Sequence, residues 1–425
     1  MRTARALRIR RAPALLSVLL AIAAGAPAAA AIASTVPPPT PVPVPGGGTS
    51  PSPFPTALTT PAPSTEPPDL VAPSAALVDL DSGQVLFEKD AGARRPVASL
   101  TKIMTALLVL QRSQPSDLVT VSADAAVPRQ TVGVSQLGLQ AGERISVGQL
   151  LYALLLQSAN DAAVALAEHV SGSVDSFVTA MNARARRLGL RNTRFASPNG
   201  LDDTGYSSAL DLARLTRVAY RDPLFAQVVA TKFDDIPSPG GEPRVVQNRN
   251  VLLWLYPGAI GVKTGYTSAA GFCVVAAAQR AELRLVAVVL GEPGEPFSAA
   301  AELLDFGFSA FERRQLVEAG ERLGSVQIDG RAVQAAAGAP LEGLVPTDAQ
   351  VRRTIRLRPG TAFPPPVGER IGSVVVVAGD LRLGTVPLVV TDVPPPPPPD
   401  PGPWWWRAGS AVVRAAGGLL SGLFG

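Results

Sequence analysis

The sequence of 425 residues is poor in three side chains that carry much of protein chemistry, because it has one cysteine, one histidine and four lysines. A single cysteine, Cys273, excludes an intramolecular disulfide. A single histidine, His169, excludes a zinc site built from several histidines and any serine–histidine mechanism that does not use it. Arginine carries the rest of the positive charge. The four lysines are Lys89, Lys102, Lys232 and Lys263.

Aromatic residues and net charge are also scarce, at 5% of the chain and +4 respectively. The arginines are scattered and form no basic stripe with interleaved aromatic residues, so the sequence argues against nucleic-acid binding. We expect Cys273, which lies in a strand-like run, to be buried and inert. His169 is expected to be a packed or surface residue rather than a catalyst.

Residues 1–33 have the three parts of a secretory signal peptide. Five arginines lie among residues 2–11, an apolar run covers 12–24, and the small-residue stretch APAAAAIAS follows. Cleavage is expected near residues 31–33, and an uncleaved signal anchor is the alternative. Both place the rest of the chain outside the cytoplasm. We therefore expect an exported protein at the outer face of the cytoplasmic membrane or in the cell wall.

Low-complexity segments flank the parts of the chain that can fold. Residues 34–71 are rich in Pro, Ser and Thr, and 393–403 contain the run VPPPPPPDPGP, so both are predicted to be extended linkers. Residues 404–425 begin with three tryptophans and then place polar residues on one helical stripe. This pattern favours an amphipathic helix in the membrane interface. A short spanning helix, made costly by two arginines, or a buried core helix are the alternatives.

Residues 72–312 mix strand and helix patterns. The run SAALVDLDSGQVLFEKD predicts a hairpin around residues 81–83. Strands are predicted in AIGVKTGYT, GFCVVAAAQ and LRLVAVVLG, with a final helix in SAAAELLDFGFSAF. This pattern favours an α/β (α+β) domain in which helices cover an antiparallel sheet. The other predicted helices cover residues 100–110, 147–157, 160–170, 174–188 and 208–220.

Residues 313–392 consist of short β-rich segments broken by Gly and Pro, such as GSVQIDG, TIRLRPG and GSVVVVAGD. They predict a small all-β domain. The segment carries no cluster of residues able to perform chemistry, so the functional residues are expected upstream.

The first motif with catalytic potential is Ser99-Leu100-Thr101-Lys102 at a predicted helix start. A spacing of three places the hydroxyl and the amine on one helical face. A serine becomes a nucleophile when a base takes its proton, and a lysine with a lowered pKa can be that base, whereas arginine cannot. Taken alone, the motif favours a helix cap followed by a solvated charge.

Two further motifs follow. Ser158-Ala159-Asn160 comes directly after the apolar run LLYALLLQ, where it is either a helix cap or a polar group held in a cleft. Lys263-Thr264-Gly265 lies in a predicted strand. Its lysine and hydroxyl suit an anion, and its glycine permits close approach by a ligand backbone. An edge strand protected by lysine is the alternative.

Together, the order S-x-x-K, S-x-N, K-T-G resembles that of the penicillin-recognising serine transpeptidases and β-lactamases. The stretches VASLTKIMTALLVL, LLLQSANDAAVALAEHV, FASPNGLDDTGYSSALDLARL and GAIGVKTGYTSAAGFCVVAAAQ are similar to the low-molecular-weight D-alanyl-D-alanine carboxypeptidases. This resemblance covers residues 72–312. Residues 313–392 resemble more weakly the β-rich C-terminal domain of that family, and the last helix fits its membrane anchor.

The resemblance implies a role for each motif residue. Ser99 would attack the carbonyl between two D-alanines, and Lys102 would be the general base, kept neutral by Lys263 and by burial. Ser158 and Asn160 would complete the proton relay and hold the substrate amide. The remaining roles would be carboxylate binding by Lys263 and Thr264, close approach of the substrate at Gly265, and an oxyanion hole from the backbone N–H groups of Ser99 and Tyr266.

The implied activity is removal of the terminal D-alanine from peptidoglycan stem pentapeptides, with no metal and no cofactor. β-Lactams would acylate the same serine. A β-lactamase or a DD-endopeptidase of the same superfamily is the nearest alternative. A non-catalytic cell-wall scaffold is the alternative from another class. The sequence leaves the stem-peptide preference and the oligomeric state open.

Overall fold

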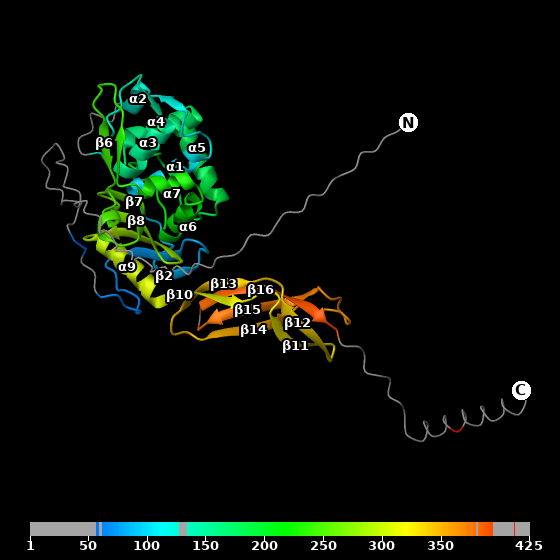
Figure 1. Ribbon diagram of the computed structural model, residues 1–425. Helices are drawn as coiled ribbons and strands as arrows, with labels where there is room; N and C mark the ends of the chain where they lie inside the picture. Colours follow the sequence, from blue (N-terminus) through cyan, green and yellow to red (C-terminus); the bar gives the residue numbers. More distant parts are fainter. Residues whose placement is uncertain (1–56, 59–61, 127–133, 380, 394–411, 413–425) are drawn as a thin grey trace, which may run out of the picture. The chain divides into compact units, whose positions relative to one another are not determined.

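The computed structural model in Figure 1 describes residues 57–58, 62–126, 134–379, 381–393 and 412. The predicted signal peptide, most of both linkers and nearly all of the C-terminal helix lie outside these residues. Within the described ranges, no helix is long and apolar enough to cross a membrane.

A five-stranded antiparallel sheet forms the centre of the first part of the chain, as predicted. Its strand order is β2-β1-β9-β8-β7. The hairpin β1–β2 pairs through β1 with β9, which returns from the far end of the sequence, in a register that runs from Ser74↔Leu290 to Asp79↔Leu285. The strands are β1 (Ser74–Asp79), β2 (Val85–Lys89), β7 (Ala259–Thr267), β8 (Gly271–Arg280) and β9 (Leu283–Glu292).

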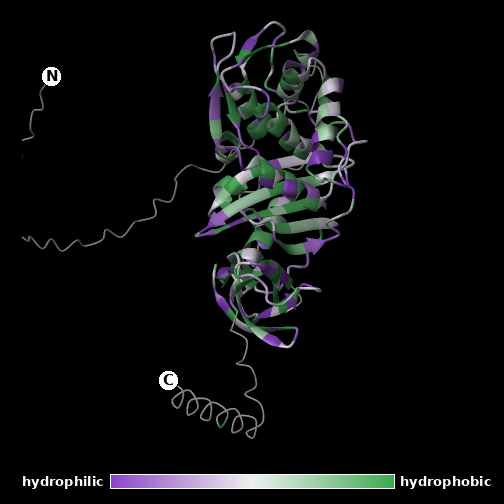
Figure 2. Cartoon of the chain, turned by 90° about the vertical axis from the view of Figure 1, so that its right-hand side faces the viewer, coloured by the Kyte–Doolittle hydropathy of each residue, from purple (hydrophilic) through white to green (hydrophobic). Residues whose placement is uncertain are grey.

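Helices cover both faces of this sheet, because its central strands are apolar on both sides. Along β9, Val286 and Val288 belong to one core cluster, whereas Ala287 and Val289 belong to another. Helix α9 (Pro296–Ala310) packs on the second face and the helical block on the first. In Figure 2 the helical block and the middle of the sheet are coloured mainly as hydrophobic.

The helical block matches most of the predicted helices. Helix α1 (Lys102–Leu110) is buried along all of its residues except Leu110, which agrees with its all-round apolar pattern. One helix is different, because the predicted helix over 147–157 changes into a π-helical turn, η3 (Ala153–Gln157). The others are α3 (Val147–Tyr152), α4 (Asn160–Ser171), α5 (Val174–Arg187), α6 (Ala209–Ala219) and α7 (Pro223–Ala230).

Several short elements were not predicted, because most of them have only three or four residues, which are too few to show a period. They are the helical segments α2 (Ala123–Ala126) and α8 (Leu252–Leu255) and two hairpins, together with the eight-residue helix α7. The hairpin strands are β3 (Leu118–Thr120), β4 (Arg144–Ser146), β5 (Phe233–Ile236) and β6 (Arg244–Gln247).

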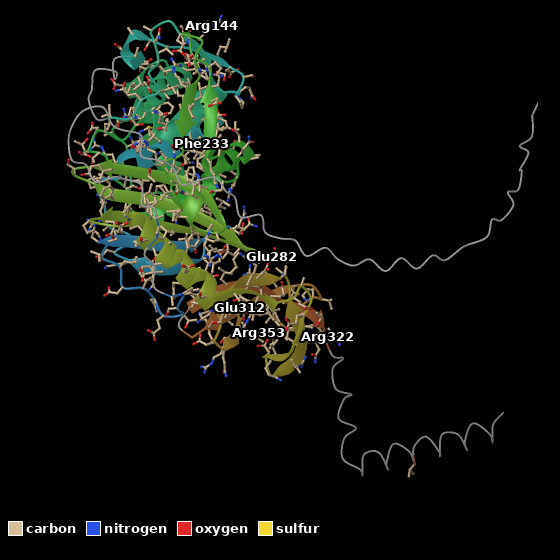
Figure 3. The ribbon with its side chains drawn as sticks, turned by 60° about the vertical axis from the view of Figure 1, so that its left-hand side comes forward. Arg144, Phe233, Glu282, Glu312, Arg322 and Arg353 are labelled. Carbon is tan, nitrogen blue, oxygen red and sulfur yellow. The ribbon has the colours of Figure 1, made fainter. Side chains whose placement is uncertain are left out.

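The C-terminal region is all-β, as predicted. One sheet has the order β11-β12-β16-β15-β14, and β10 pairs with β13. Alternate residues of these strands form a separate core, and arginines such as Arg322 and Arg353 lie at the surface (Figure 3). The strands are β10 (Phe311–Val317), β11 (Arg322–Ile328), β12 (Arg331–Ala337), β13 (Leu341–Pro346), β14 (Val351–Leu357), β15 (Arg370–Ala378) and β16 (Leu381–Asp392).

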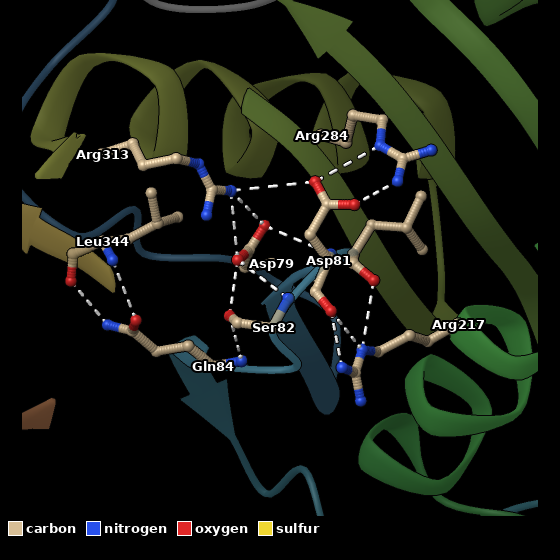
Figure 4. Close-up of polar contacts among 9 residues, drawn as sticks. Asp79, Asp81, Ser82, Gln84, Arg217, Arg284, Arg313 and Leu344 are labelled. Atoms are coloured by element: carbon tan, nitrogen blue, oxygen red, sulfur yellow. Dashed lines mark hydrogen bonds and ion pairs between the residues drawn. The ribbon is translucent and has the colours of Figure 1, made fainter. Parts of the chain in front are cut away.

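Polar contacts join the β1–β2 turn to the β10–β13 pair (Figure 4). The fully buried Asp79 carboxylate accepts hydrogen bonds from Arg313 at 3.1 and 3.3 Å and from the Ser82 N–H at 3.1 Å. The Gln84 side chain donates to the carbonyl of Leu344 at 2.6 Å and accepts from its N–H at 3.0 Å. The Asp79 carboxylate and the Gln84 side-chain amide thus bind the β1–β2 hairpin to the C-terminal strands.

Candidate active site

Ser99 lies in a 3-10 turn, η1 (Ala98–Thr101), that leads directly into α1. The cap position before this turn is Val97, and neither η1 nor α1 has a side-chain cap, so Ser99 is not a helix cap. Ala98 adopts a positive φ of 45°, which is uncommon for a residue with a side chain. The half-buried Ser99 is therefore held by local backbone geometry rather than by a capping bond.

Lys102 is fully buried, and its amine faces Ser99. Its Nζ lies 2.9 Å from Ser99 Oγ and donates to Asn160 Oδ1 at 2.7 Å and to the carbonyl of Asn199 at 2.8 Å. Burial holds the pKa of Lys102 well below its usual value, and the nearby charges of Lys263 and Arg249 lower it further. A lysine in this state can accept a proton from a hydroxyl, so the interpretation of a solvated surface charge is wrong.

The second motif forms a wall beside Lys102. Ser158 takes a left-handed conformation (φ 67°) where η3 ends, and its buried Oγ has no hydrogen-bond partner within the described ranges. Asn160 opens α4, whose cap residue Ala159 makes no side-chain cap bond. Both polar side chains are thus buried at the junction of two helices rather than used as caps. This placement leaves the Ser158 hydroxyl able to transfer a proton or to bind a substrate.

The third motif runs along β7, the edge strand beside η1. Lys263 is only 1% exposed, so it does not protect the strand edge. Its Nζ donates to the Thr264 carbonyl at 2.9 Å. Burial lowers the pKa of Lys263 to about 7, with a further contribution from Arg249. Thr264 and Gly265 are half-buried, and the exposed Tyr266 ring packs on Phe272 at 4.6 Å between centroids.

The segment around Asn199 and Gly200 passes directly beneath the serine turn. Gly200 has a positive φ of 81°, and a Cβ atom there would lie 1.9 Å from the Ala98 carbonyl oxygen. Only glycine fits such an approach. This close approach brings the Asn199 carbonyl to Lys102.

Two functional neighbours were missed in the sequence. Arg249, in the polar run QNRN after β6, places a positive charge near both Lys102 and Lys263. The buried Asp161 carboxylate follows Asn160 and accepts three backbone N–H bonds, from residues 137 to 139. The polar run between apolar segments was the available sequence signal for Arg249. Because Arg249 is 14 residues from Lys263 in the chain, the sequence did not show that the two side chains lie near each other.

Two other reactive side chains, Cys273 and His169, are not in contact with Ser99 or Lys102 by any hydrogen bond within the described residues, although Cys273 lies opposite Gly265 in the β7–β8 pair. Cys273 is buried, and burial raises the pKa of its thiol to about 11, which makes it inert as predicted. His169 is exposed at the end of α4. Among the described residues, no group of three or more His, Cys, Asp or Glu side chains could hold a metal ion.

The Ser99 hydroxyl lies within hydrogen-bond distance of the buried Lys102 amine, at the start of a helix beside an antiparallel sheet. This arrangement defines the class of serine hydrolases that use lysine in place of histidine. Known proteins define the family within that class. Residues 61–294 match the family model described as D-alanyl-D-alanine carboxypeptidase. The chain belongs to this family and is a serine-type D-alanyl-D-alanine carboxypeptidase.

Individual relatives agree with this assignment. The D-alanyl-D-alanine carboxypeptidase DacF of Bacillus subtilis is 34% identical over 72% of this chain and 81% of its own length. DacB2 of Mycobacterium tuberculosis is 41% identical over 59% of this chain and 86% of its own. The crystal structure of penicillin binding protein 5 from Haemophilus influenzae superposes with a TM-score of 0.65 and 32% identity. It covers 77% of this chain and 98% of that one, so the similarity includes the C-terminal β region.

Proposed function

We propose that Ser99 is the nucleophile of this carboxypeptidase and that Lys102 is its general base. The carrying observation is the 2.9 Å contact between Lys102 Nζ and Ser99 Oγ, at a lysine whose pKa is lowered well below its usual value by burial and by neighbouring cations. A neutral amine accepts the hydroxyl proton as the oxygen attacks, and geometry within hydrogen-bond reach is the first requirement for such a base. Arginine would remain protonated in the same position.

The proposed reaction has two steps. In the first, Ser99 Oγ bonds to the carbonyl carbon of the penultimate D-alanine, and the terminal D-alanine leaves after its nitrogen takes a proton. Ser158 and Asn160 relay that proton and hold the substrate amide. In the second, water attacks the resulting ester and releases the shortened peptide and Ser99. This sequence regenerates the enzyme without a cofactor.

The terminal carboxylate is proposed to bind to Lys263 and Thr264 on β7. The carbonyl oxygen is proposed to accept hydrogen bonds from the backbone N–H groups of Ser99 and Tyr266. Support comes from Gly265, because a Cβ atom there would lie 2.9 Å from the Ser99 nitrogen, so the strand and the serine turn are in close contact. Two backbone donors on adjoining elements suit a developing oxyanion.

The natural substrate is proposed to be the peptidoglycan stem pentapeptide, and β-lactams are proposed to acylate Ser99 as mimics of it. Mass spectrometry of a pentapeptide digest tests the first point, with loss of one alanine expected. Fluorescent penicillin tests the second, since it should label the wild type and not Ser99→Ala. Labelling that survives the substitution would contradict the assignment of the nucleophile.

The same experiments separate the alternatives. Rapid turnover of penicillin without a stable adduct would favour a β-lactamase. Cleavage of a cross-linked dimer in preference to the monomeric pentapeptide would favour an endopeptidase. An inactive Ser99→Ala protein that still rescued a deletion strain would favour a scaffold.

Export through residues 1–33, followed by a membrane-surface anchor at 404–425, is proposed on the sequence pattern alone. The domain limits of 72–312 and 313–392 are proposed on the same basis. Separation of membranes from soluble fractions, for the full chain and for a chain that ends at residue 403, tests the anchor. Loss of membrane association in the shortened chain is the expected result.

A further inference from the structure

The segment over residues 134–143 is connected to Lys102 through hydrogen bonds of Asn160 and Asp161. The Asp161 carboxylate accepts the N–H groups of Leu137 at 2.9 Å, Gly138 at 2.8 Å and Leu139 at 3.1 Å. Its neighbour Asn160 donates its backbone N–H to Ser135 at 2.8 Å and accepts from Lys102 Nζ. Any movement of this segment therefore moves the wall of the site.

The β5–β6 hairpin leads along the chain to Arg249, whose charge lies near the same lysine. It leads through Asn248, whose side-chain amide donates to the carbonyls of Val229 at 3.2 Å and Thr231 at 2.9 Å. The next residue is Arg249, whose backbone N–H donates to Leu156 at 3.1 Å. These bonds anchor Asn248 and Arg249 to the ends of α7 and η3, where the hairpin ends.

One ion pair joins the segment to the hairpin. Arg244 of β6 contacts Glu143 with both terminal nitrogens, at 2.6 and 2.9 Å. The side chains of Arg244 and Glu143 are only 14% and 4% exposed. Arg244 also donates to the Gly138 carbonyl at 3.1 Å, and Glu143 accepts the Gln140 N–H at 3.0 Å. A two-point pair of this kind is directional as well as attractive.

We propose that Arg244 is a positioning residue for the carboxypeptidase reaction. With Glu143 it fastens the 134–143 segment to the β5–β6 hairpin and so holds the N–H groups of that segment on the Asp161 carboxylate, next to Asn160 and Lys102. The inference rests on the proposed role of Lys102 as the base. The contacts run from that lysine to Asn160, and from the adjacent Asp161 through Gly138 to Arg244.

The direction of the effect follows from the charges that face the Lys102 amine. Lys263 on β7 and Arg249 after β6 lower the pKa of Lys102, whereas Asp161 on α4 raises it. If the segment is released, the Asp161 carboxylate loses N–H donors that offset its charge, and its raising effect on the pKa of Lys102 strengthens. The base is then protonated at pH values where it was neutral before. The acid limb of acylation consequently moves to higher pH.

The test measures the rate of acylation of the full chain by fluorescent penicillin from about pH 5 to pH 9. In Arg244→Gln, the midpoint of the acid limb should rise by about half a pH unit. Arg244→Lys should give a smaller rise, because lysine keeps the charge but not the two-point geometry.

Arg280→Gln is the matched control. Arg280 forms a partly buried ion pair with Asp305 at 2.9 Å, and neither residue belongs to the contacts that join Arg244 to Lys102. This variant should lower Tm and leave the midpoint unchanged. A change of midpoint in Arg280→Gln equal to that in Arg244→Gln would show a general effect of lost stability and would overturn the inference.

Failure of the inference is distinct from failure of the proposed function. A wild type that penicillin does not acylate, or a Ser99→Ala variant that it does, contradicts the proposed function. Normal wild-type acylation with the same midpoint in Arg244→Gln contradicts the role of Arg244. If Arg244→Gln does not fold, Glu143→Gln decides, because it keeps the side-chain shape, and an unchanged midpoint there overturns the inference.

Discussion

A Cβ atom at Gly265 would lie 2.9 Å from the backbone nitrogen of Ser99 and 3.1 Å from the carbonyl oxygen of Val97. The β7 strand therefore reaches the serine turn only because this position has no side chain. The contact places the strand that carries Lys263 and Tyr266 directly beside the proposed nucleophile. The glycine of the K-T-G motif is needed for this approach between strand and turn.

Gly265→Ala should separate β7 from the serine turn by a few tenths of an ångström or more. We expect the rate of acylation by fluorescent penicillin to fall about 100-fold, because small displacements of reacting groups are costly. Gly240→Ala is the control, since its nearest heavy atom, Ser238 Oγ, is 3.7 Å from the added Cβ. Equal rates in the two variants would contradict the close-contact argument.

Lys102→Arg should keep the fold and lose acylation, by about 1,000-fold, because an arginine does not give up its proton at working pH. Lys263→Arg should keep more activity, with about a 10-fold loss, since its proposed role needs a positive charge. Stopped-flow acylation and a melting curve for each variant check both statements. Acylation by Lys102→Arg at the wild-type rate would show that another group is the base.

Lys263 should make the stability of the protein rise with pH above neutrality. Its pKa is lowered to about 7 in the folded state and is ordinarily near 10.5, so between these values the unfolded chain binds more protons. Stability is then gained by up to about 1.4 kcal/mol per pH unit. Below pH 7 both states are protonated and this contribution is flat.

Lys263→Met removes the buried amine and checks that sign. The variant should be more stable than the wild type at pH 7, and its advantage should shrink as the pH approaches 10. Denaturant unfolding at several pH values measures the difference. An advantage that grows with pH would show that Lys263 is charged and paired in the folded state.

Arg313→Gln should destabilise the protein by about 3 kcal/mol, because it leaves the fully buried Asp79 carboxylate without its ion-pair partner. Arg314→Gln is the matched control on the same strand. Arg314 pairs with the exposed Glu312, and exposed pairs contribute about 0–1 kcal/mol. Comparable losses in both variants would show that the burial of Asp79 does not decide the effect.

Much of the fold could be predicted from the sequence, because its long elements have strong patterns. The strands β8 and β9 and the helix α1 could be predicted from the pattern of their apolar residues alone. The π-helical end of the predicted 147–157 helix could not be predicted, since Ala153–Gln157 has an ordinary helical pattern. The short hairpin β5–β6 was missed because Phe233–Ile236 and Arg244–Gln247 are too short to show a period.

The candidate site was predicted unevenly. Ser99, Lys102, Ser158 and Lys263 could be named from motif order and from the scarcity of lysine. Arg249 and the Arg244–Glu143 pair could not, because partners 101 residues apart leave no local signal.

By itself, the sequence determined which side chains are available for chemistry. The single histidine and the single cysteine excluded a zinc site built from several histidines and an intramolecular disulfide. Two of the four lysines lie within the motifs, and an arginine could not act as a base in their place. Only the tertiary structure decided that Lys102 is buried beside Ser99 and is not a surface charge. A pKa depends on burial and on nearby charges, and these are set by η1, α4, β7 and Arg249, which meet in space and not along the chain.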